Sequence, residues 1–282
     1  MNYLLSAGTV SELLTEISKI LSNNSIESHQ TEAIQIITHF LKVDRTQIFL
    51  KPDLPISHFI RSQISELLRG RCLGMPLQYL LGEVEFYNSM IKVTPDVLIP
   101  RPETELLVDT ILQENPQTCL KVCDLCTGSG AIAISLKKAR PRWQVTATDI
   151  SPAALKVALQ NALDNNCQID FIISDLFSNI DTKFDLIVSN PPYISEHDYE
   201  NLKPELYYEP RLALAAPDNG IYFYKKIIQL APSYLKGSAT LYLEIGADQS
   251  RQLTQLANHA PTNSITIKKD YNNHDRFLII RF

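Results

Sequence analysis

The stretch that decides the fold is LKVCDLCTGSGAIAISLKKA, residues 120–139. It begins with an apolar run typical of a buried strand, continues into a turn with two glycines, and ends with apolar residues at helical spacing. Glycine permits a sharp reversal of the backbone and lets a ligand approach it closely. The segment therefore predicts a strand, a tight turn and a helix, with a candidate ligand site at the turn.

Strand-like and helix-like runs continue to alternate after this segment. Three strand-like runs (143–149, 169–174, 184–190) and one helix-like run (152–163) come first, followed by a helix, a strand, a helix and two strands (222–235, 239–246, 247–260, 264–271, 276–282). Apolar strands separated by helices are typical of a parallel sheet covered by helices. A turn at Asn272 and Asn273 joins the last two strands, so the final strand is expected to run antiparallel. We therefore expect an α/β fold with a mostly parallel sheet.

The first part of the chain has a different pattern. Thr9 and Glu12 are spaced for a capping box, and apolar residues then recur at helical spacing in three stretches, 13–21, 33–41 and 60–68. Apolar residues also alternate on both sides of Asn88 and Ser89, which indicates a hairpin. These patterns predict a helical domain over residues 1–75, a linking β-hairpin over 76–100 and an α/β domain over 101–282.

Composition excludes several classes of protein. The chain has 282 residues, 45% of them hydrophobic, and a net charge of −5, which disfavours a general nucleic-acid or anionic-lipid binder. The N-terminus lacks the basic start of a secretory signal, and no run of about 18 apolar residues exists. Five cysteines form an odd set that argues against a disulfide framework. We expect a cytoplasmic monomer that does not bind membranes.

The glycine turn contains the first candidate site. It runs through Cys126, Thr127, Gly128, Ser129 and Gly130 between a strand and a helix, so free N–H groups at the helix start face a ligand. Asp149 ends the next strand, where a carboxylate can accept hydrogen bonds from both hydroxyls of a ribose. The spacing does not match the dinucleotide motif, and S-adenosylmethionine is a nucleoside ligand without a pyrophosphate. The alternative interpretation is a tight turn with an aspartate that caps the next helix at Ser151.

The second candidate site is Asn190-Pro191-Pro192-Tyr193, directly after the apolar run 184–189. Two successive prolines hold the backbone stiff and extended. The Asn190 side-chain oxygen and the Pro191 carbonyl then provide two acceptors for the two donors of a planar NH2 group, and Tyr193 can pack against that group. The alternative, a proline-rich loop that only ends a strand, does not explain the flanking asparagine and tyrosine.

Together these motifs resemble class I S-adenosylmethionine-dependent methyltransferases that modify planar nitrogens, and more closely the protein-(glutamine-N5) methyltransferases of the release factor glutamine methyltransferase (HemK/PrmC) family. Further matching segments are 76–79 with Gly82, 85–87, 98–105, 174–177, 209–210, 244–246 and 269–270. The resemblance implies a Rossmann-like, seven-stranded sheet with an antiparallel last strand, and a helical domain that recognises the substrate. It also implies methyl transfer from S-adenosylmethionine to the glutamine of the Gly-Gly-Gln motif in peptide chain release factors.

The resemblance also assigns the site residues. Asn190, Pro191 and Tyr193 would be catalytic, and these three with Pro192 would bind the substrate. The cofactor would be bound by the glycine turn (Cys126, Thr127, Gly128, Ser129 and Gly130), Asp149, Asn190 and Phe177, whose ring would form a wall for the adenine. Cys126 stands where the family usually has glycine, so we expect that this position does not adopt a positive φ.

Several alternatives remain at this point. The same motifs are compatible with three other functions: methylation of a ribosomal-protein glutamine, N6-adenine methylation of nucleic acid, and cofactor binding by a sensor. The lack of a basic footprint disfavours a nucleic-acid substrate. Cys119, Cys123 and Cys126 have the spacing of an iron–sulfur motif, but strand geometry keeps the first two about 13 Å apart. The six histidines are scattered, so we expect no metal site. Asp175 is either a contact of the adenine amino group or simply solvated, and Arg101 and Glu103 either shape the pocket rim or form a surface ion pair.

Overall fold

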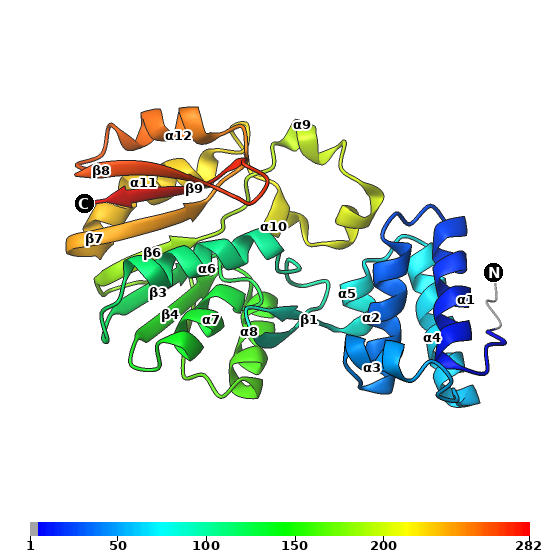
Figure 1. Cartoon of the computed structure of the whole chain (residues 1–282). Helices are drawn as coiled ribbons and strands as arrows, with labels where there is room; N and C mark the ends of the chain where they lie inside the picture. Colours follow the sequence, from blue (N-terminus) through cyan, green and yellow to red (C-terminus); the bar gives the residue numbers. More distant parts are fainter. Residues whose placement is uncertain (1–4) are drawn as a thin grey trace. The chain divides into compact units, whose positions relative to one another are not determined.

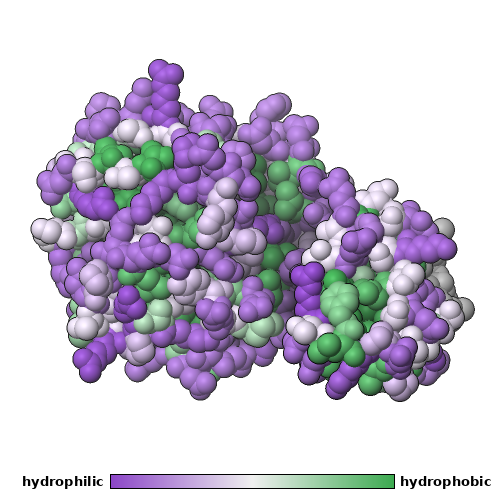
Figure 2. Space-filling model, in the orientation of Figure 1, coloured by the Kyte–Doolittle hydropathy of each residue, from purple (hydrophilic) through white to green (hydrophobic). Residues whose placement is uncertain are grey.

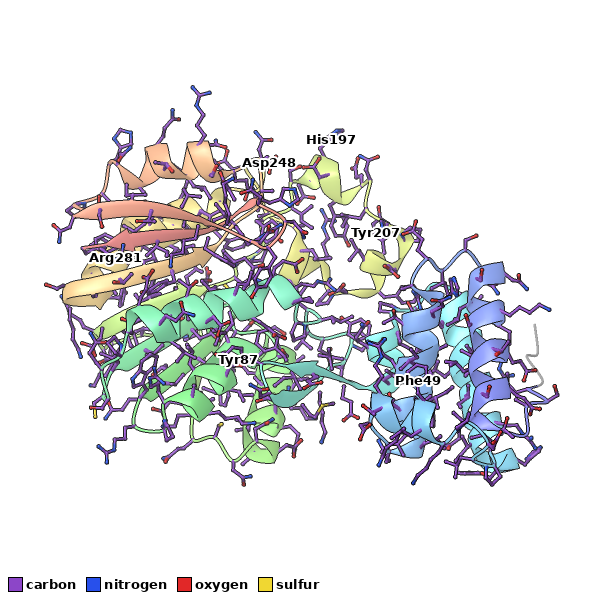
Figure 3. The ribbon with its side chains drawn as sticks, viewed as in Figure 1. Phe49, Tyr87, His197, Tyr207, Asp248 and Arg281 are labelled. Atoms are coloured by element: carbon purple, nitrogen blue, oxygen red, sulfur yellow. The ribbon has the colours of Figure 1, made fainter. Side chains whose placement is uncertain are left out.

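The computed structural model describes residues 5–282 and divides into two compact units, Met1–Gly82 and Glu83–Phe282 (Figure 1). Among the described residues, no helix is both long and apolar enough to cross a membrane. The surface seen in Figure 2 is mostly hydrophilic, and its green area on the helical unit lies where Figure 3 labels the exposed Phe49 in the same orientation.

The regular elements of unit 1, within its described residues 5–82, are helices. Its helices are α1 (Val10–Asn23), α2 (His29–Leu41), α3 (Arg45–Leu50), α4 (His58–Cys72) and α5 (Leu77–Leu81). The predicted capping box is confirmed, because the Thr9 side chain accepts a hydrogen bond from the Glu12 N–H and Glu12 accepts one from the Thr9 N–H. The apolar faces meet in one core, which also holds a buried ion pair between Arg71 and Glu32 at 2.7 Å. Since both charges are compensated, this pair links α2 to α4 without leaving an unpaired buried ion.

Unit 2 is built on a seven-stranded sheet with the order β5-β4-β3-β6-β7-β9-β8. The strands are β3 (Lys121–Leu125), β4 (Gln144–Asp149), β5 (Asp170–Ile173), β6 (Phe184–Ser189), β7 (Leu235–Glu244), β8 (Ser264–Lys269) and β9 (Asp275–Arg281). The pairs from β5 to β7 are parallel, whereas β9 pairs antiparallel with both β7 and β8. The predicted α/β class, with a mostly parallel sheet and an antiparallel last strand, is confirmed.

Helices cover the sheet as the alternation of elements predicts. They are α6 (Pro102–Glu114), α7 (Ala131–Ala139), α8 (Pro152–Asp164), α11 (Tyr222–Tyr234) and α12 (Ser250–Ala257). Buried side chains of α11 and α12 share one core with inward residues of β3, β6, β7 and β9. α7 and α8 pack on β4, and α6 packs on α7. The helices cover the faces of the sheet and leave its carboxyl edge open. Sheets of this kind bind their ligands at that edge.

The predicted hairpin consists of β1 (Glu83–Phe86) and β2 (Ser89–Lys92) and belongs to unit 2. Its two turn residues, Tyr87 and Asn88, both have positive φ (44° and 60°), as a type I′ hairpin turn requires. Asn161 on α8 accepts a hydrogen bond from the Lys92 N–H at 2.8 Å and donates one to the Lys92 carbonyl at 3.0 Å. The hairpin is therefore fixed to the body of unit 2.

A long excursion connects β6 to α11 over residues 190–221. It contains three short helices, α9 (Glu196–Tyr199), η1 (Pro204–Tyr208) and α10 (Arg211–Leu214), drawn in yellow-green to yellow in Figure 1. The excursion begins at Asn190, at the carboxyl end of a central strand. It is thus placed to cover the ligand-binding edge of the sheet.

Candidate functional site

The glycine loop lies between β3 and α7 and has three residues with positive φ. These are Cys126 (59°), Gly128 (56°) and Gly130 (82°). A Cβ at Gly130 would lie 3.2 Å from the Ala158 Cβ, whereas a Cβ at Gly128 would meet nothing within 4 Å. Gly130 is therefore needed for close packing of α7 on α8, and Gly128 leaves open space beside the turn.

A buried carboxylate supports this loop from behind. Asp124 accepts hydrogen bonds from the Thr127 hydroxyl at 2.6 Å and from the Ala133 N–H at 3.2 Å. Desolvation by burial raises the pKa of Asp124 to about 7. The carboxyl group ties the loop to the first turn of α7, so it acts on the ligand site through the backbone.

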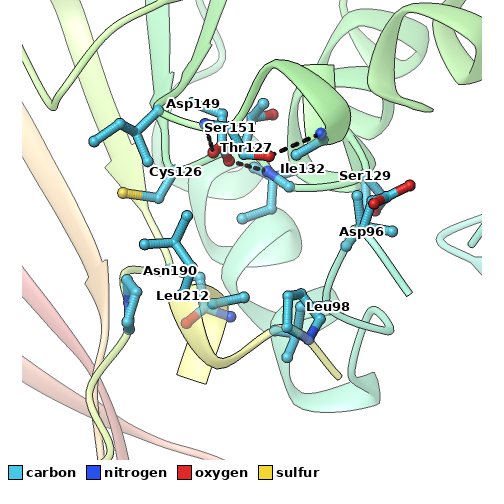
Figure 4. A pocket seen from close by; sticks show the side chains of 18 of the residues that line it. Asp96, Leu98, Cys126, Thr127, Ser129, Ile132, Asp149, Ser151, Asn190 and Leu212 are labelled. Carbon is cyan, nitrogen blue, oxygen red and sulfur yellow. Dashed lines mark hydrogen bonds between the residues drawn. The ribbon is translucent and has the colours of Figure 1, made fainter. Parts of the chain in front are cut away.

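The expectation for Cys126 is wrong. Residue 126 does adopt a left-handed conformation, with φ of 59°, although it carries a side chain. A non-glycine residue in this region is strained by about 1 to 2 kcal/mol, so the surrounding loop must impose the conformation. Burial raises the pKa of the Cys126 thiol. The side chain is thus a neutral wall of the cavity shown in Figure 4.

Asp149 ends β4 and is held in a fixed orientation. Its carboxylate accepts hydrogen bonds from the Gly128 N–H and the Ser151 N–H, both at 2.9 Å. Ser151 separately caps α8 by accepting a hydrogen bond from the Ala154 N–H. Burial raises the pKa of Asp149. The two interpretations of Asp149 are therefore compatible, because the carboxylate organises the start of α8 and also lines the cavity beside the glycine loop.

The first cavity lies at the carboxyl ends of β3, β4, β5 and β6 (Figure 4). The residues that line it are Asp96, Val97, Leu98, Pro100, Arg101, Thr104, 126–129, Ala131, Ile132, 149–151, Ala154, 174–176, Asn190, Pro192, Pro210, Leu212, Ala213 and Phe223. Most of the predicted cofactor residues are thus brought together. Gly130 is not part of the lining, and its role is to form the turn.

Phe177 also lies outside the lining of the first cavity. Its side chain is only 2% exposed and stacks on Tyr234 of α11, with ring centroids 4.5 Å apart. Leu176 adopts a positive φ of 49°, and the chain then turns Phe177 into the core between the sheet and α11. The aromatic residue that lines the cavity is Phe223, whose position in a helix after the excursion gave no signal in the sequence. Asp175 does line the cavity.

A second cavity adjoins the first. It is lined by Leu98, Arg101, Asn190, Tyr193, Ile194, Leu206, Ala213, Leu214 and Glu244. Four residues line both cavities: Leu98, Arg101, Asn190 and Ala213. Asn190 therefore lies on the wall that the two cavities share.

The Asn190-Pro191-Pro192-Tyr193 segment is fixed by the chain around it. The Tyr193 carbonyl accepts a hydrogen bond from the Gln249 side chain at 3.1 Å. Gly220 packs so closely on the same carbonyl that a Cβ there would lie 2.2 Å from the oxygen. Burial, and then the negative charge of Glu244, raise the pKa of Tyr193 to about 12. The phenol is therefore neutral, and the Tyr193 carbonyl is held by Gln249 on one side and by Gly220 on the other.

Arg101 forms its ion pair with Glu209 rather than with Glu103. The Glu209 side chain is buried and also accepts a hydrogen bond from the Ile99 N–H at 3.0 Å. The pair thus joins the segment before α6 to the excursion at the rim of both cavities. This answers the question left by the sequence, because Arg101 shapes the rim through a partner 108 residues away.

Glu244 is the residue that the sequence interpretation did not assign to the site. It ends β7, is 2% exposed and lines the second cavity. Its carboxylate accepts a hydrogen bond from the Thr104 hydroxyl at 2.7 Å, and the nearby Asn190 side chain acts on it as a donor that lowers its pKa. Burial raises the pKa of Glu244 to about 7. The available signal was a charged residue within an otherwise apolar strand.

The cysteines are placed apart. Cys119 is exposed, Cys123 is fully buried in the core of the sheet and Cys126 lies beside the first cavity, and all are free thiols. Among residues 5–282, no group of three His, Cys, Asp or Glu side chains has the arrangement of a metal site. The C-x3-C-x2-C spacing therefore reflects a strand and its turn.

Comparison with known proteins extends this description. Residues 102–214 match the model of the methyltransferase small domain, and residues 12–82 match that of the PrmC N-terminal domain. A release factor glutamine methyltransferase from Streptococcus pneumoniae is 47% identical over 77% of this chain and 78% of its own length. One from Thermodesulfovibrio yellowstonii is 39% identical over 92% and 94%. The crystal structure of a methyltransferase from Pyrococcus furiosus shares the fold, with a TM-score of 0.53 and 18% identity over 68% of this chain and 87% of that one.

Proposed function

The chain belongs to the release factor glutamine methyltransferase family, and on that premise we propose that it transfers a methyl group from S-adenosylmethionine to a glutamine side-chain nitrogen of peptide chain release factors. Two relatives, which are 39% and 47% identical to this chain over most of its length, are named release factor glutamine methyltransferases. The observation that carries the proposal is the position of Asn190, on the wall shared by two adjoining cavities. One cavity can hold the methyl donor while the other admits the amide.

The donor set of the first cavity fits S-adenosylmethionine. The Asp149 carboxylate is held by two backbone N–H groups, and its remaining lone pairs can accept hydrogen bonds from the two ribose hydroxyls. Thr127, Gly128 and Ser129 would surround the amino-acid part, while Phe223 provides an aromatic wall. When bound, this cofactor supplies a methyl group made electrophilic by the attached sulfonium.

The Asn190 side-chain oxygen and the Pro191 carbonyl form what we call the Asn190 clamp, which orients the substrate amide. The NH2 group of the substrate glutamine donates one hydrogen bond to each of these two acceptors, so its nitrogen faces the methyl group. S-adenosylmethionine held by Asp149 and the glycine loop would supply the methyl group to this nitrogen, with the electron pair of the cleaved bond left on its sulfur. The nitrogen then loses one proton to solvent. Tyr193 is neutral at physiological pH and contributes packing and hydrogen bonding rather than acting as a base.

Substrate identity rests on the family and on charge. The net charge of −5 disfavours nucleic acid, although an adenine amino group would satisfy the same two acceptors. We assign recognition of the protein substrate to the helical unit, which matches the PrmC N-terminal domain. Because release factors act during translation, the reaction belongs to the cytoplasm, and we take the enzyme to act as a monomer.

The test is methylation of defined substrates. Purified enzyme is incubated with labelled S-adenosylmethionine and, in parallel, with bacterial release factors, a ribosomal protein and an adenine-containing oligonucleotide. We expect mass spectrometry to find one added methyl on the glutamine of the Gly-Gly-Gln motif. Methylation of either other substrate, with the release factors unmodified, would contradict the assignment.

A further inference from the structure

The Asn190 clamp depends on which way its side-chain amide points. The oxygen and nitrogen of a carboxamide occupy nearly the same space, and only the oxygen can accept a hydrogen bond from an incoming NH2 group. A rotation of 180° about the Cβ–Cγ bond of Asn190 would place its own NH2 group, a donor, against the substrate NH2 group, which is also a donor. The clamp therefore needs a neighbour that distinguishes the two orientations.

Glu244 is placed to make this distinction. β6 and β7 pair in parallel, with Ser189 opposite Leu243, so the following residues, Asn190 and Glu244, lie side by side at the carboxyl edge of the sheet. Both residues line the second cavity, and the Asn190 carboxamide is close enough to the Glu244 carboxylate to act on it as a donor that lowers its pKa. An ionised carboxylate has acceptors only, so the Asn190 nitrogen must face it and the oxygen must face away.

The Glu244 side chain is itself held in place. The Thr104 hydroxyl on α6 donates a hydrogen bond to its Oε2 at 2.7 Å, and the Tyr224 hydroxyl on α11 donates one to its main-chain carbonyl at 2.8 Å. Helices from two separate parts of unit 2 therefore fix the strand end and the carboxylate. A structural role alone would not require an acidic group here, because burial disfavours its charge.

We propose that Glu244 is a positioning residue, which holds the Asn190 carboxamide in the one orientation that accepts the substrate NH2 group. This inference rests on the proposed amide methylation. Glu244 acts through Asn190, and Thr104 acts through Glu244.

The charge of Glu244 makes this role depend on pH. The charged or titratable groups around it are Glu103 on α6, Arg276 on β9, Tyr193 after β6, Tyr224 on α11 and Arg101 at the cavity rim. Burial raises the pKa of Glu244 to about 7. Below this pH the acid carries a proton and can donate to the Asn190 oxygen, which stabilises the wrong orientation. Above it, only the productive orientation is stabilised.

The test uses Glu244→Gln, which keeps the shape but adds a donor. A hydrogen bond to a charged group corresponds to about 10- to 100-fold in orientation preference. We expect the kcat of E244Q to fall by about this factor at pH 8, with the Kd for S-adenosylmethionine within about twofold. The kcat of the wild type should rise with pH across the Glu244 ionisation, whereas the profile of E244Q should lack this step. Glu114→Gln on α6, which removes a carboxylate bonded to Tyr242 and Arg281, is the matched control and should behave as the wild type.

A second measurement does not depend on turnover. The Asn190 side-chain NH2 protons, observed by NMR, should be protected from exchange in the wild type and in E114Q, and should lose this protection in E244Q. If the wild type methylates no glutamine, the proposed function fails while the Asn190 resonances still decide the orientation. Unchanged Asn190 resonances, or a kcat and pH profile of E244Q equal to those of the wild type, would overturn the role of Glu244.

Discussion

The glycine loop and the Asn190 clamp border the same cavity, but they are held by different means. The glycine loop is shaped by its own backbone, with positive φ at Cys126, Gly128 and Gly130, and by Asp124 just before it. The clamp is stiffened locally by two prolines, and its other contacts come from distant segments, through Glu244 and Gln249. A loop shaped by its own backbone, such as the glycine loop, can be recognised in a short stretch of sequence. The distant residues that hold the clamp can be identified only once the strand order of the sheet is known.

The largest expected effect is on the clamp. Asn190→Ala removes one of the two acceptors that orient the amide, and we expect kcat to fall by about 100- to 1000-fold, as when one preorganised hydrogen-bonding group is removed from an active site. The Kd for S-adenosylmethionine, measured by calorimetry, should change little because the glycine loop and Asp149 are intact. Normal turnover in N190A would refute the role of Asn190.

The corresponding change beside the glycine loop is Asp149→Asn. It should weaken S-adenosylmethionine binding by about 10- to 100-fold, because the amide replaces one acceptor oxygen with a donor that faces the Gly128 or Ser151 N–H. At saturating cofactor, kcat should remain within a few fold of the wild type. Titration of the cofactor and saturation kinetics separate the two effects, and a loss of kcat with unchanged affinity would show that the two loops do not divide the work in this way.

Stability should respond to pH through the buried Asp124. Its pKa is raised by burial to about 7, above the ordinary value of 3.8, so between these values the folded protein retains a proton that the unfolded chain has lost. The contribution of Asp124 to the free energy of unfolding is therefore fully present below about pH 4. It decreases by about 1.4 kcal/mol per pH unit as the pH rises towards 7. Asp124→Asn should remove that part of the slope in denaturant unfolding at pH 5, 6 and 7. An equal slope in both proteins would contradict it.

The smallest expected effect is at Cys126. Replacing it with glycine relieves the left-handed strain but adds freedom to the unfolded chain, so we expect a net gain in the free energy of unfolding of at most about 1 kcal/mol. The Kd for S-adenosylmethionine should stay within about threefold. A marked loss of stability would mean that the side chain, rather than the backbone, holds this turn.

The sequence predicted the elements well where local patterns determine them. The strands and helices of unit 2, the capping box at Thr9 and the antiparallel last strand follow from periodicity and turn residues. The positive φ of Cys126 did not, because a loop closed by tertiary contacts can impose a conformation that the residue disfavours. The inward position of Phe177 followed from the turn at Leu176, which has no sequence signature.

The supports of the site were harder to predict than its motifs. Glu244 and Thr104 are 140 residues apart in the chain, and Glu209 and Arg101 are 108 apart. Their pairing depends on strand order and on the path of the 190–221 excursion, neither of which is encoded in local spacing. An acidic residue in an apolar strand is a useful signal, since its burial requires partners.

The contact at Gly220 limits how this enzyme can evolve. Any side chain at that position would collide with the Tyr193 carbonyl, so a replacement must be accompanied by a shift of the tyrosine loop or of the start of α11. Single-step mutational paths through residue 220 are therefore closed while neighbouring surface positions stay open. In a saturation library, we expect this position to tolerate fewer amino acids than Asp218 and Asn219 beside it.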